Sequence, residues 1–414
     1  MSDTLRQKSR CRICGNTELQ QFLDLGDQPP ANALLRADEI HLPEAKYPLA
    51  LSNCPKCELI QTTHVVAPEV LFRNYVYFSS VSQAMEKHFA AYAQSVAEKF
   101  VPPNGLFMEI GSNDGILLKS LIGKPVKILG VDPARNVAEV ARGKGVPTIA
   151  DFFTEGLARE IRKKEGPASV VVANNVIAHI DDLDEVMRGL TAVLADDGVF
   201  VMEAPYVVHF LEHLEFDTVY HEHLSYFGVR ALSHLFERFG MEVFDVLDQG
   251  VHGGSIRVFA RRKRAGTAPV SASVQAHFEL EKSAGVADPK RLAKFATQVA
   301  ALRQEIRALI AKLKLEGKRV VGYTAPAKGN VLLNYCGLGT QDLAYLADAT
   351  PAKQGLYSPG MHIPVLSPEH FRNDKPDYAL LLAWNHKDEI MKKEAAWRQG
   401  GGKFIIPVPK VDAQ

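Results

Sequence analysis

The sequence predicts an α/β protein in three parts: a small cysteine-bearing module, a central doubly wound sheet, and a second, smaller α/β domain. Three observations support this prediction: two pairs of cysteines near the N-terminus, apolar strands that alternate with amphipathic helices, and a second such alternation after a long helix. A chain of 414 residues is also too long for one ordinary domain. We expect the parts to cover residues 1–75, 76–265 and 266–414.

The composition argues against several classes of protein. Lys and Arg together number 48, as do Asp and Glu, and so balanced a charge does not indicate a nucleic-acid binder. No apolar stretch approaches the ~18 residues that cross a bilayer, and the N-terminus lacks the apolar core of a signal peptide. We therefore expect a cytoplasmic protein without a nucleic-acid or membrane partner. Because clefts between three parts need no second chain, we also expect a monomer.

The central part is expected to contain six strands. They are Leu106–Ile110, Val126–Val131, Ser169–Ala173, Val199–Glu203, Met241–Leu247 and Ser255–Ala260. Strands that alternate with helices form right-handed crossovers and hence a parallel sheet. Only a short glycine-containing turn joins the last two strands, so the final strand must run antiparallel.

The third part opens with a helix expected from Leu292 to Lys314, where apolar residues recur at three- and four-residue spacing. Four more strands are expected after it, at Arg319–Tyr323, Ala344–Ala347, Tyr378–Ala383 and Lys403–Pro407. This pattern predicts a second sheet of the α/β kind, similar to a Rossmann domain.

Two Cys-x2-Cys pairs lie in the first part: Cys11 with Cys14, and Cys54 with Cys57. Each pair directs two thiolates at one ion, and two pairs complete a tetrahedral Zn²⁺ shell. Disulfides would conflict with a cytoplasmic location, and redox pairs are uncommon outside a thioredoxin context. Because four cysteines leave no position for water or substrate, the predicted zinc is structural. The fifth cysteine, Cys336, is expected to be a small core residue.

The strand that ends at Ile110 leads through the loop Gly111–Gly115, of sequence Gly-Ser-Asn-Asp-Gly, into a helix expected near Ile116. A dinucleotide-binding loop would need Gly-x-Gly-x-x-Gly to seat a pyrophosphate, and the carboxylate of Asp114 disfavours a phosphate. S-adenosylmethionine carries an ammonium, a sulfonium and a ribose but no phosphate. The loop therefore favours S-adenosylmethionine as the cofactor.

Acidic and amide residues also follow the neighbouring strands. Each alone is equally typical of an ordinary turn or cap, but their order favours a class I methyltransferase over a plain α/β scaffold. The predicted cofactor contacts are Glu109, Gly111, Ser112, Asn113 and Gly115 in and before the loop, Asp132 at the ribose, Asp151 and Phe152 at the adenine, and Asn174 and Asn175 at the methionine part.

The densest run of ionisable groups follows the strand Val199–Glu203 and reads Tyr220-His221-Glu222-His223-Leu224-Ser225-Tyr226. Loops at the carboxyl ends of α/β strands are where substrate meets cofactor, which favours catalysis over a set of hydrogen-bonded core histidines. His179 follows the strand Ser169–Ala173 and would approach the same cleft. It is equally typical of a residue at a helix entry.

These motifs, in this order, resemble those of the nucleotide-sugar C-3′-methyltransferases, which make branched deoxysugars. The resemblance covers nearly the whole chain and includes both cysteine pairs, the Tyr75–Ser80 segment, the Glu109–Gly115 loop, the Tyr220–Tyr226 run and the Gly322–Asn330 segment. It implies that His223 is the catalytic base and that Tyr220, Glu222 and His179 complete the active site. The family has an aromatic-rich Tyr-x-Tyr-Tyr stretch where this chain has Phe78, so either Tyr75 or Tyr77 reaches the substrate.

The third part has its own strand-loop-helix, in which Lys328 lies at a turn of small residues. Such a lysine can bind a diphosphate, although the same sequence is also typical of a vestigial α/β turn without a ligand. Later loops of the same sheet edge would complete a nucleotide site. The predicted substrate-binding residues are Tyr75, Tyr77, Lys328, Asn330, Lys353, Trp384 and Asn385, with Tyr357 nearby.

Methylating carbon requires an enolate or its equivalent, and a histidine with a pKa near ~6.5 can take the proton next to a ketone at neutral pH. The predicted function is therefore S-adenosylmethionine-dependent methylation of carbon 3 of a nucleotide-linked 4-keto-deoxysugar. The alternatives are an O- or N-methyltransferase on a small acceptor, or a non-catalytic zinc-containing binding protein with a degenerate methyltransferase core.

Overall fold

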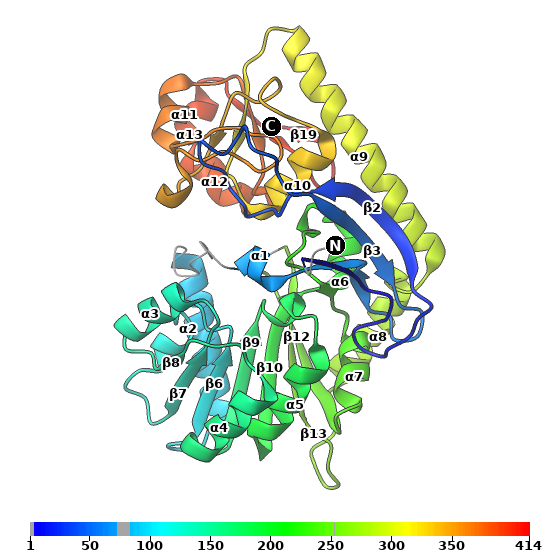
Figure 1. Ribbon diagram of the computed structural model, residues 1–414, viewed down its shortest axis with the longest axis vertical. Coiled ribbons are helices and arrows are strands. Elements are labelled where there is room, and N and C mark those ends of the chain that lie inside the picture. Colours follow the sequence, from blue (N-terminus) through cyan, green and yellow to red (C-terminus); the bar gives the residue numbers. More distant parts are fainter. Residues whose placement is uncertain (1–3, 73–82, 252) are drawn as a thin grey trace.

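The computed structural model describes residues 4–72, 83–251 and 253–414. Figure 1 shows the central sheet below, the second sheet above, and the N-terminal module between them on one side. The predicted fold class is confirmed: a doubly wound α/β sheet flanked by a cysteine-bearing module and a further parallel α/β sheet. The predicted domain boundaries stay predictions.

The central sheet has seven strands in the order β12-β13-β10-β9-β6-β7-β8. Only β13 runs antiparallel to its neighbours, as expected from the short turn before it. The other neighbouring pairs are parallel, so their carboxyl ends meet at one edge. The strands are β6 (Leu106–Ile110), β7 (Lys127–Val131), β8 (Thr148–Ile149), β9 (Ala168–Asn174), β10 (Leu194–Pro205), β12 (Met241–Gln249) and β13 (Ser255–Arg262).

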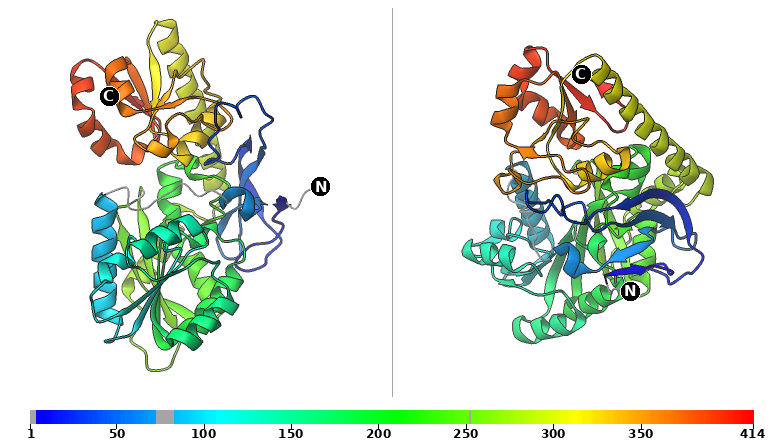
Figure 2. Two further views of the ribbon diagram at one scale, coloured as in Figure 1. Left: turned by 60° about the vertical axis from the view of Figure 1, so that its left-hand side comes forward. Right: turned by 45° about the horizontal axis from the view of Figure 1, so that its top comes forward.

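Helices cover both faces of this sheet (Figure 2). Because side chains alternate along a strand, Phe107 of β6 packs on one face and Met108 on the other. The first face is covered by α2 (Gln83–Phe100) and α3 (Arg135–Gly143). The second is covered by α4 (Glu155–Glu165), α5 (Leu183–Val193), α6 (Val207–Glu212) and α7 (Val229–Glu237).

The prediction of a helix that starts near Ile116 is wrong. The chain turns after β6 and forms only a short 3₁₀ helix, η2 (Leu118–Leu121). In the loop before it, φ is positive at Gly111 (69°), Asn113 (47°) and Gly115 (76°), so the loop itself is not helical.

The N-terminal module is a four-stranded sheet in the order β11-β4-β3-β2. Its strands β2 (Gln20–Gln28), β3 (Tyr47–Asn53) and β4 (Ile60–Thr62) come from the module, but β11 (Ser225–Tyr226) comes from the central part of the chain. A ribbon of β1 (Leu5–Gln7) and β5 (His64–Val66) and the short helix α1 (Pro68–Phe72) complete the module. The module is therefore joined to the central part by sheet hydrogen bonds.

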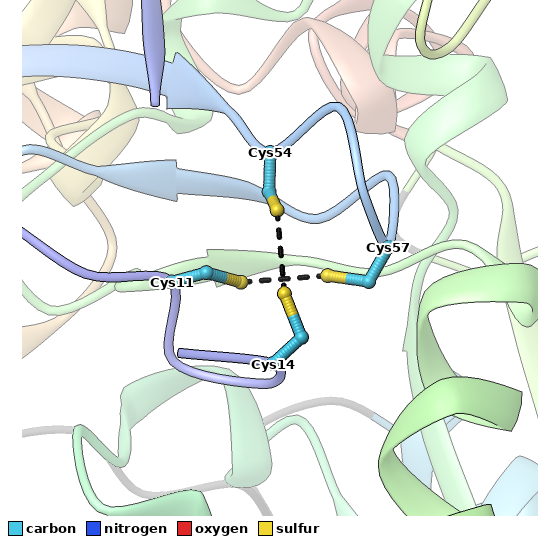
Figure 3. A group of neighbouring side chains, drawn as sticks. All are labelled: Cys11, Cys14, Cys54 and Cys57. Carbon is cyan, nitrogen blue, oxygen red and sulfur yellow. Dashed lines mark hydrogen bonds between the residues drawn. The ribbon is translucent and has the colours of Figure 1, made fainter. Parts of the chain in front are cut away.

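The four module cysteines converge on one point (Figure 3). All four sulfurs lie within 4.8 Å of one another, with Cys11 Sγ 3.4 Å from Cys57 Sγ and Cys14 Sγ 3.5 Å from Cys54 Sγ. A disulfide would need about 2.05 Å, whereas a tetrahedral Zn²⁺ with Zn–S bonds of about 2.3 Å spaces its sulfurs by about 3.8 Å. The residues therefore fit the predicted structural zinc.

The C-terminal sheet has six strands in the order β16-β15-β14-β17-β18-β19, all parallel except β19. The strands are β14 (Val320–Tyr323), β15 (Leu346–Ala347), β16 (Val365–Leu366), β17 (Tyr378–Leu381), β18 (Lys403–Ile406) and β19 (Asp412–Ala413). Its helices are α10 (Ala327–Cys336), α11 (Pro368–Asp374), α12 (Lys387–Lys393) and α13 (Ala395–Gln399). The predicted strands are confirmed, while the two-residue β16 and β19 were not foreseen.

The long helix was predicted correctly and is α9 (Pro289–Leu315), which runs along the side of the molecule (Figure 1). Its Phe295 ring contacts Phe210 of α6 and Phe22 of the module, with ring centroids 4.9 and 6.2 Å away. The preceding α8 (Ala272–Ala284) packs on α6, α7 and β12 of the central part. Among the described residues, no helix is long and apolar enough to cross a membrane.

We expect one zinc ion per chain. Cys54→Ala removes a zinc ligand, so this variant should lose the zinc. It should also unfold at a lower temperature, because the metal holds the two cysteine pairs together. Zinc content by mass spectrometry and thermal unfolding check this. Cys336→Ala is the matched control, since it removes a buried thiol from α10 and should keep the metal. A Cys54→Ala protein that retains one zinc would contradict the assignment.

Candidate active site

The predicted cofactor residues gather at the carboxyl ends of β6, β7 and β9. The amide of Gly111 donates to the carbonyl of Val131, 2.8 Å away, which draws the loop across the end of β7. A Cβ atom on Gly111 would lie 2.7 Å from the Val176 side chain, so only glycine fits there. The loop therefore lies close against the segment that follows β9.

Asp132 directly follows β7 and shapes the same loop. Its carboxylate accepts hydrogen bonds from the amides of Asn113 (2.8 Å) and Ala134 (2.9 Å). Burial raises the pKa of Asp132, while the two amides oppose that rise. The predicted ribose acceptor is thus held in place by the backbone on both sides of it.

Several buried polar atoms at this edge lack a hydrogen-bond partner among the described residues. They are Glu109 Oε2, Ser112 Oγ, Asn174 Oδ1 and Asn175 Oδ1. The other Glu109 oxygen accepts from Asn174 Nδ2 at 3.3 Å, and burial holds the pKa of Glu109 well above its ordinary value. Buried polar groups are normally paired, so unpaired acceptors here fit a ligand that carries donors. The ammonium and hydroxyls of S-adenosylmethionine are such donors.

Two predictions about this edge have different outcomes. Asp151 and Phe152 follow β8, and both are exposed, with Phe152 at 54%. The exposed Phe152 ring after β8 is consistent with the adenine contact, which stays a prediction. Asp114, expected to set the charge of the loop, instead lies 2.8 Å from Lys144 Nζ, so a cation offsets its charge.

His223 lies in the loop between the 3₁₀ helix η4 (Phe216–Thr218) and β11, and its ring is fixed from two sides. Its Nδ1 lies 2.9 Å from the carbonyl oxygen of Thr218, and because a carbonyl only accepts, Nδ1 carries the hydrogen. The lone pair is therefore on Nε2, which accepts from the Tyr220 hydroxyl at 2.6 Å. This tautomer suits a base that acts through Nε2. We call residues 216–226 the catalytic segment.

His179 lies beside this pair, as predicted. It ends the 3₁₀ helix η3 (Ile177–His179) after β9, and its ring centroid is 5.0 Å from that of His223. Although part of the side chain stays accessible, burial lowers the pKa of His179 to about 4. At neutral pH it is an uncharged ring that can donate a hydrogen bond without adding a charge.

The Thr218 carbonyl orients the His223 ring, and Glu222 has a different partner. The Glu222 carboxylate instead accepts from Asn32 Nδ2 of the N-terminal module, 2.7 Å away. Burial raises the pKa of Glu222 to about 7. The neighbouring His221 is a core residue: its Nε2 lies 3.1 Å from the carbonyl of Tyr47, and burial lowers its pKa to about 4.

Three predicted substrate residues meet at the carboxyl ends of β14 and β17. Lys328 Nζ donates to Asn385 Oδ1 and lies 4.6 Å from the centroid of the Trp384 ring. Burial lowers the pKa of Lys328. The Trp384 indole donates to Asp217 of η4 at 2.7 Å, which links this cluster to the catalytic segment. Burial raises the pKa of Asp217 to about 6, although Lys328 and Trp384 oppose the rise.

The remaining predicted substrate residues have other contacts. Asn330 Nδ2 donates to the carbonyl of Ala31 at 2.8 Å, and Lys353 Nζ donates to the carbonyl of Ala325 at 2.8 Å. Tyr357 pairs through its backbone with Leu35 of the module. Tyr75 and Tyr77 lie outside the described residues.

Sequence reasoning missed three residues that shape the site: Asn32, Asp217 and Thr218. Asn32 is 190 positions from the carboxylate it contacts, and no local pattern marks such a pair. Thr218 acts through its backbone, which any residue type supplies. The one available signal was an acidic residue three positions before the Tyr-His-Glu-His run, and it points to Asp217.

We expect Asp132→Asn to weaken binding of S-adenosylmethionine about 10- to 100-fold, because a charge-assisted hydrogen bond contributes ~1.5–3 kcal/mol. Isothermal titration calorimetry measures this. Asp197→Asn is the control, since Asp197 is exposed near the amino end of β10. Equal affinities for the two variants would contradict the ribose assignment.

Three family models match the chain: a putative zinc binding domain over residues 11–72, a methyltransferase domain over 84–246, and a C-methyltransferase C-terminal domain over 250–409. The C-methyltransferase NovU of Streptomyces niveus is 39% identical over 411 residues, which cover 99% of this chain and 98% of that protein.

Solved structures of methyltransferases are also similar. One is a methyltransferase from Thermotoga maritima described as a possible histamine N-methyltransferase, with a TM-score of 0.33 at 16% identity over 43% of this chain and 91% of that chain. Another is the magnesium protoporphyrin IX methyltransferase of Synechocystis, with a TM-score of 0.32 at 12% identity over 44% and 79%. With the match to NovU along its whole length, the chain belongs to the S-adenosylmethionine-dependent C-methyltransferases that carry an N-terminal zinc-binding domain and a C-methyltransferase C-terminal domain.

Proposed function

We propose that this C-methyltransferase methylates carbon 3 of a 4-keto-deoxysugar linked to a nucleoside diphosphate. The observation that carries the proposal is the His223 ring, whose Nδ1 is held by Thr218 so that Nε2 is the basic atom. O- and N-methylation need no base for a C–H bond, whereas methylation of carbon beside a ketone does.

His223 removes the proton from the acceptor carbon. The C–H electron pair moves into the C–C bond as the ketone becomes an enolate, and the proton moves to Nε2. Since the Tyr220 hydroxyl is 2.6 Å from Nε2, the acceptor must displace that hydroxyl or pass its proton through it. When bound, S-adenosylmethionine would supply an electrophilic methyl carbon on a sulfonium: the new C–C bond to the enolate carbon forms as the S–CH3 bond breaks and its electron pair stays on the sulfur.

The enolate oxygen needs hydrogen-bond donors, and Tyr220 and His179 are the candidates. His179 is neutral at pH 7, so one of its ring nitrogens carries a hydrogen that can be donated to the developing charge. A Tyr220 hydroxyl displaced from Nε2 becomes free to donate in the same way. Both rings lie against His223, which keeps base and donors within reach of one ketone.

The cluster of Lys328, Trp384 and Asn385 is proposed to bind the nucleoside diphosphate. A lysine at the start of α10 offers a cation and a helix N-terminus to the phosphates, and its Nζ lies over the buried Trp384 ring. The Trp384–Asp217 contact leads from this cluster to the catalytic segment. Asn330, Lys353, Tyr75 and Tyr77 remain predicted substrate contacts.

We also propose that the enzyme works as a monomer in the cytoplasm, where its thiols stay reduced for zinc. The site is built from three parts of one chain, and no step above needs a second chain. The domain limits at residues 75 and 265 are part of the proposal.

The test is mass spectrometry after incubation with S-adenosylmethionine and a panel of 4-keto-6-deoxy nucleotide sugars in deuterated water. The acceptor should gain one methyl group, and unreacted acceptor should gain deuterium at the carbon that His223 deprotonates. His223→Gln should lose both signals, by about 100-fold or more, because general-base catalysis contributes ~10²–10⁴-fold.

The variant His41→Gln is the control, because His41 is exposed and lies outside the site. S-adenosylmethionine should bind His223→Gln with unchanged affinity. Near-normal methylation by His223→Gln would contradict the assignment of His223 as the base. Methylation at oxygen or nitrogen would contradict the proposal that the acceptor atom is a carbon.

A further inference from the structure

Asn32 brings the zinc-binding module into contact with the active-site run. Its Nδ2 lies 2.7 Å from Glu222 Oε1, and the Glu222 side chain is almost fully buried, at 3% exposed. A charge-assisted hydrogen bond of this length fixes the position of the carboxylate it reaches. Glu222 directly precedes His223 in the chain, so the module contacts the segment that carries the proposed base.

The turn that carries Asn32 is itself held firmly. Within the turn, the Ala33 amide donates to the Pro30 carbonyl and the Leu34 amide to the Asn32 carbonyl, both at 3.0 Å. From outside, Asn330 of α10 donates to the Ala31 carbonyl at 2.8 Å. The amide of Asn32 is therefore pre-set by contacts from two parts of the chain, and one of these is the helix that begins with the proposed diphosphate-binding lysine.

The surroundings of Glu222 make this hydrogen bond important for its charge. Burial disfavours the carboxylate, whereas the Asn32 amide favours it, and the balance leaves the pKa of Glu222 at about 7. Among the described residues, no charged side chain contributes to the shift. The adjacent His221 is neutral, since burial lowers its pKa to about 4.

We propose that Asn32 is a positioning residue for methyl transfer: its amide orients the Glu222 carboxylate and favours the charged form, so that the zinc-binding module takes part in building the active site. The inference rests on the proposed function in one respect, because that function assigns Glu222 to the site.

The first experiment needs no acceptor. The protein is labelled with ¹³C at the glutamate carboxyl carbon, and Glu222→Gln identifies the signal of Glu222. In the unmodified enzyme this carboxyl should titrate near pH 7. Asn32→Ala should raise the midpoint by about one to two pH units, because the donor that favours the charged form is lost. Asn32→Asp keeps the size of the side chain and should raise it further, since two carboxyls then share one site.

The second experiment is the pH profile of methyl transfer with an acceptor that the enzyme methylates. The acid limb should move to higher pH in Asn32→Ala by the same amount as the Glu222 titration. In a Glu222→Gln background, Asn32→Ala should cause no further change. S-adenosylmethionine affinity and zinc content should stay unchanged in every variant, which separates positioning from a loss of fold.

Gln28→Ala is the matched control. Gln28 is a buried amide of the same module, and its Nε2 donates to the Leu25 carbonyl within that module. It should leave both the titration and the pH profile as they are. An unchanged Glu222 midpoint in both Asn32 variants would overturn the inference, as would a shifted midpoint with an unshifted activity profile. Since the titration needs no sugar, a failure of the proposed acceptor would leave its result intact.

Discussion

The pairing of β11 with β4 is the contact on which the active site depends. β11 has only two residues, too few to hold a conformation alone, and it directly follows the Tyr-His-Glu-His run. Ser225 and Tyr226 pair with Gln61 and Ile60, in a strand that follows the second cysteine pair. Hydrogen bonds then run from the Thr62 amide to the Leu224 carbonyl (3.1 Å) and from the Leu224 amide to the Ala178 carbonyl (2.8 Å), next to His179. Backbone hydrogen bonds thus connect the zinc-binding module to both histidine segments.

The other end of the catalytic segment is fixed from the C-terminal domain. Trp384 holds Asp217, the next residue is Thr218, and the Thr218 carbonyl sets the tautomer of His223. The carboxyl edges of the two sheets therefore meet at this segment, one carrying the cofactor loop and the other the Lys328 cluster. An acceptor with a reactive ring at one end and a nucleoside diphosphate at the other would span such a junction.

The sequence was most informative where burial or backbone geometry leaves few choices. Buried strands such as β6 and β9 appear as continuous apolar runs, the cysteine pairs have a spacing that one metal explains, and Gly111 meets Val176 too closely for any other residue. It was least informative where a contact joins distant positions. The Asn32–Glu222 pair, the two-residue strands β16 and β19, and the 3₁₀ turn in place of a helix after Gly115 all depend on tertiary packing that no local pattern encodes.

A crystal structure with S-adenosylhomocysteine and a 4-keto sugar nucleotide would test the central claim most directly. The account predicts that carbon 3 of the sugar lies between the cofactor sulfur and Nε2 of His223, with the Tyr220 hydroxyl moved from Nε2 and the nucleotide against Lys328 and Trp384. A sugar whose carbon 3 is remote from Nε2, or an oxygen or nitrogen of the acceptor in line with the sulfur, would contradict it.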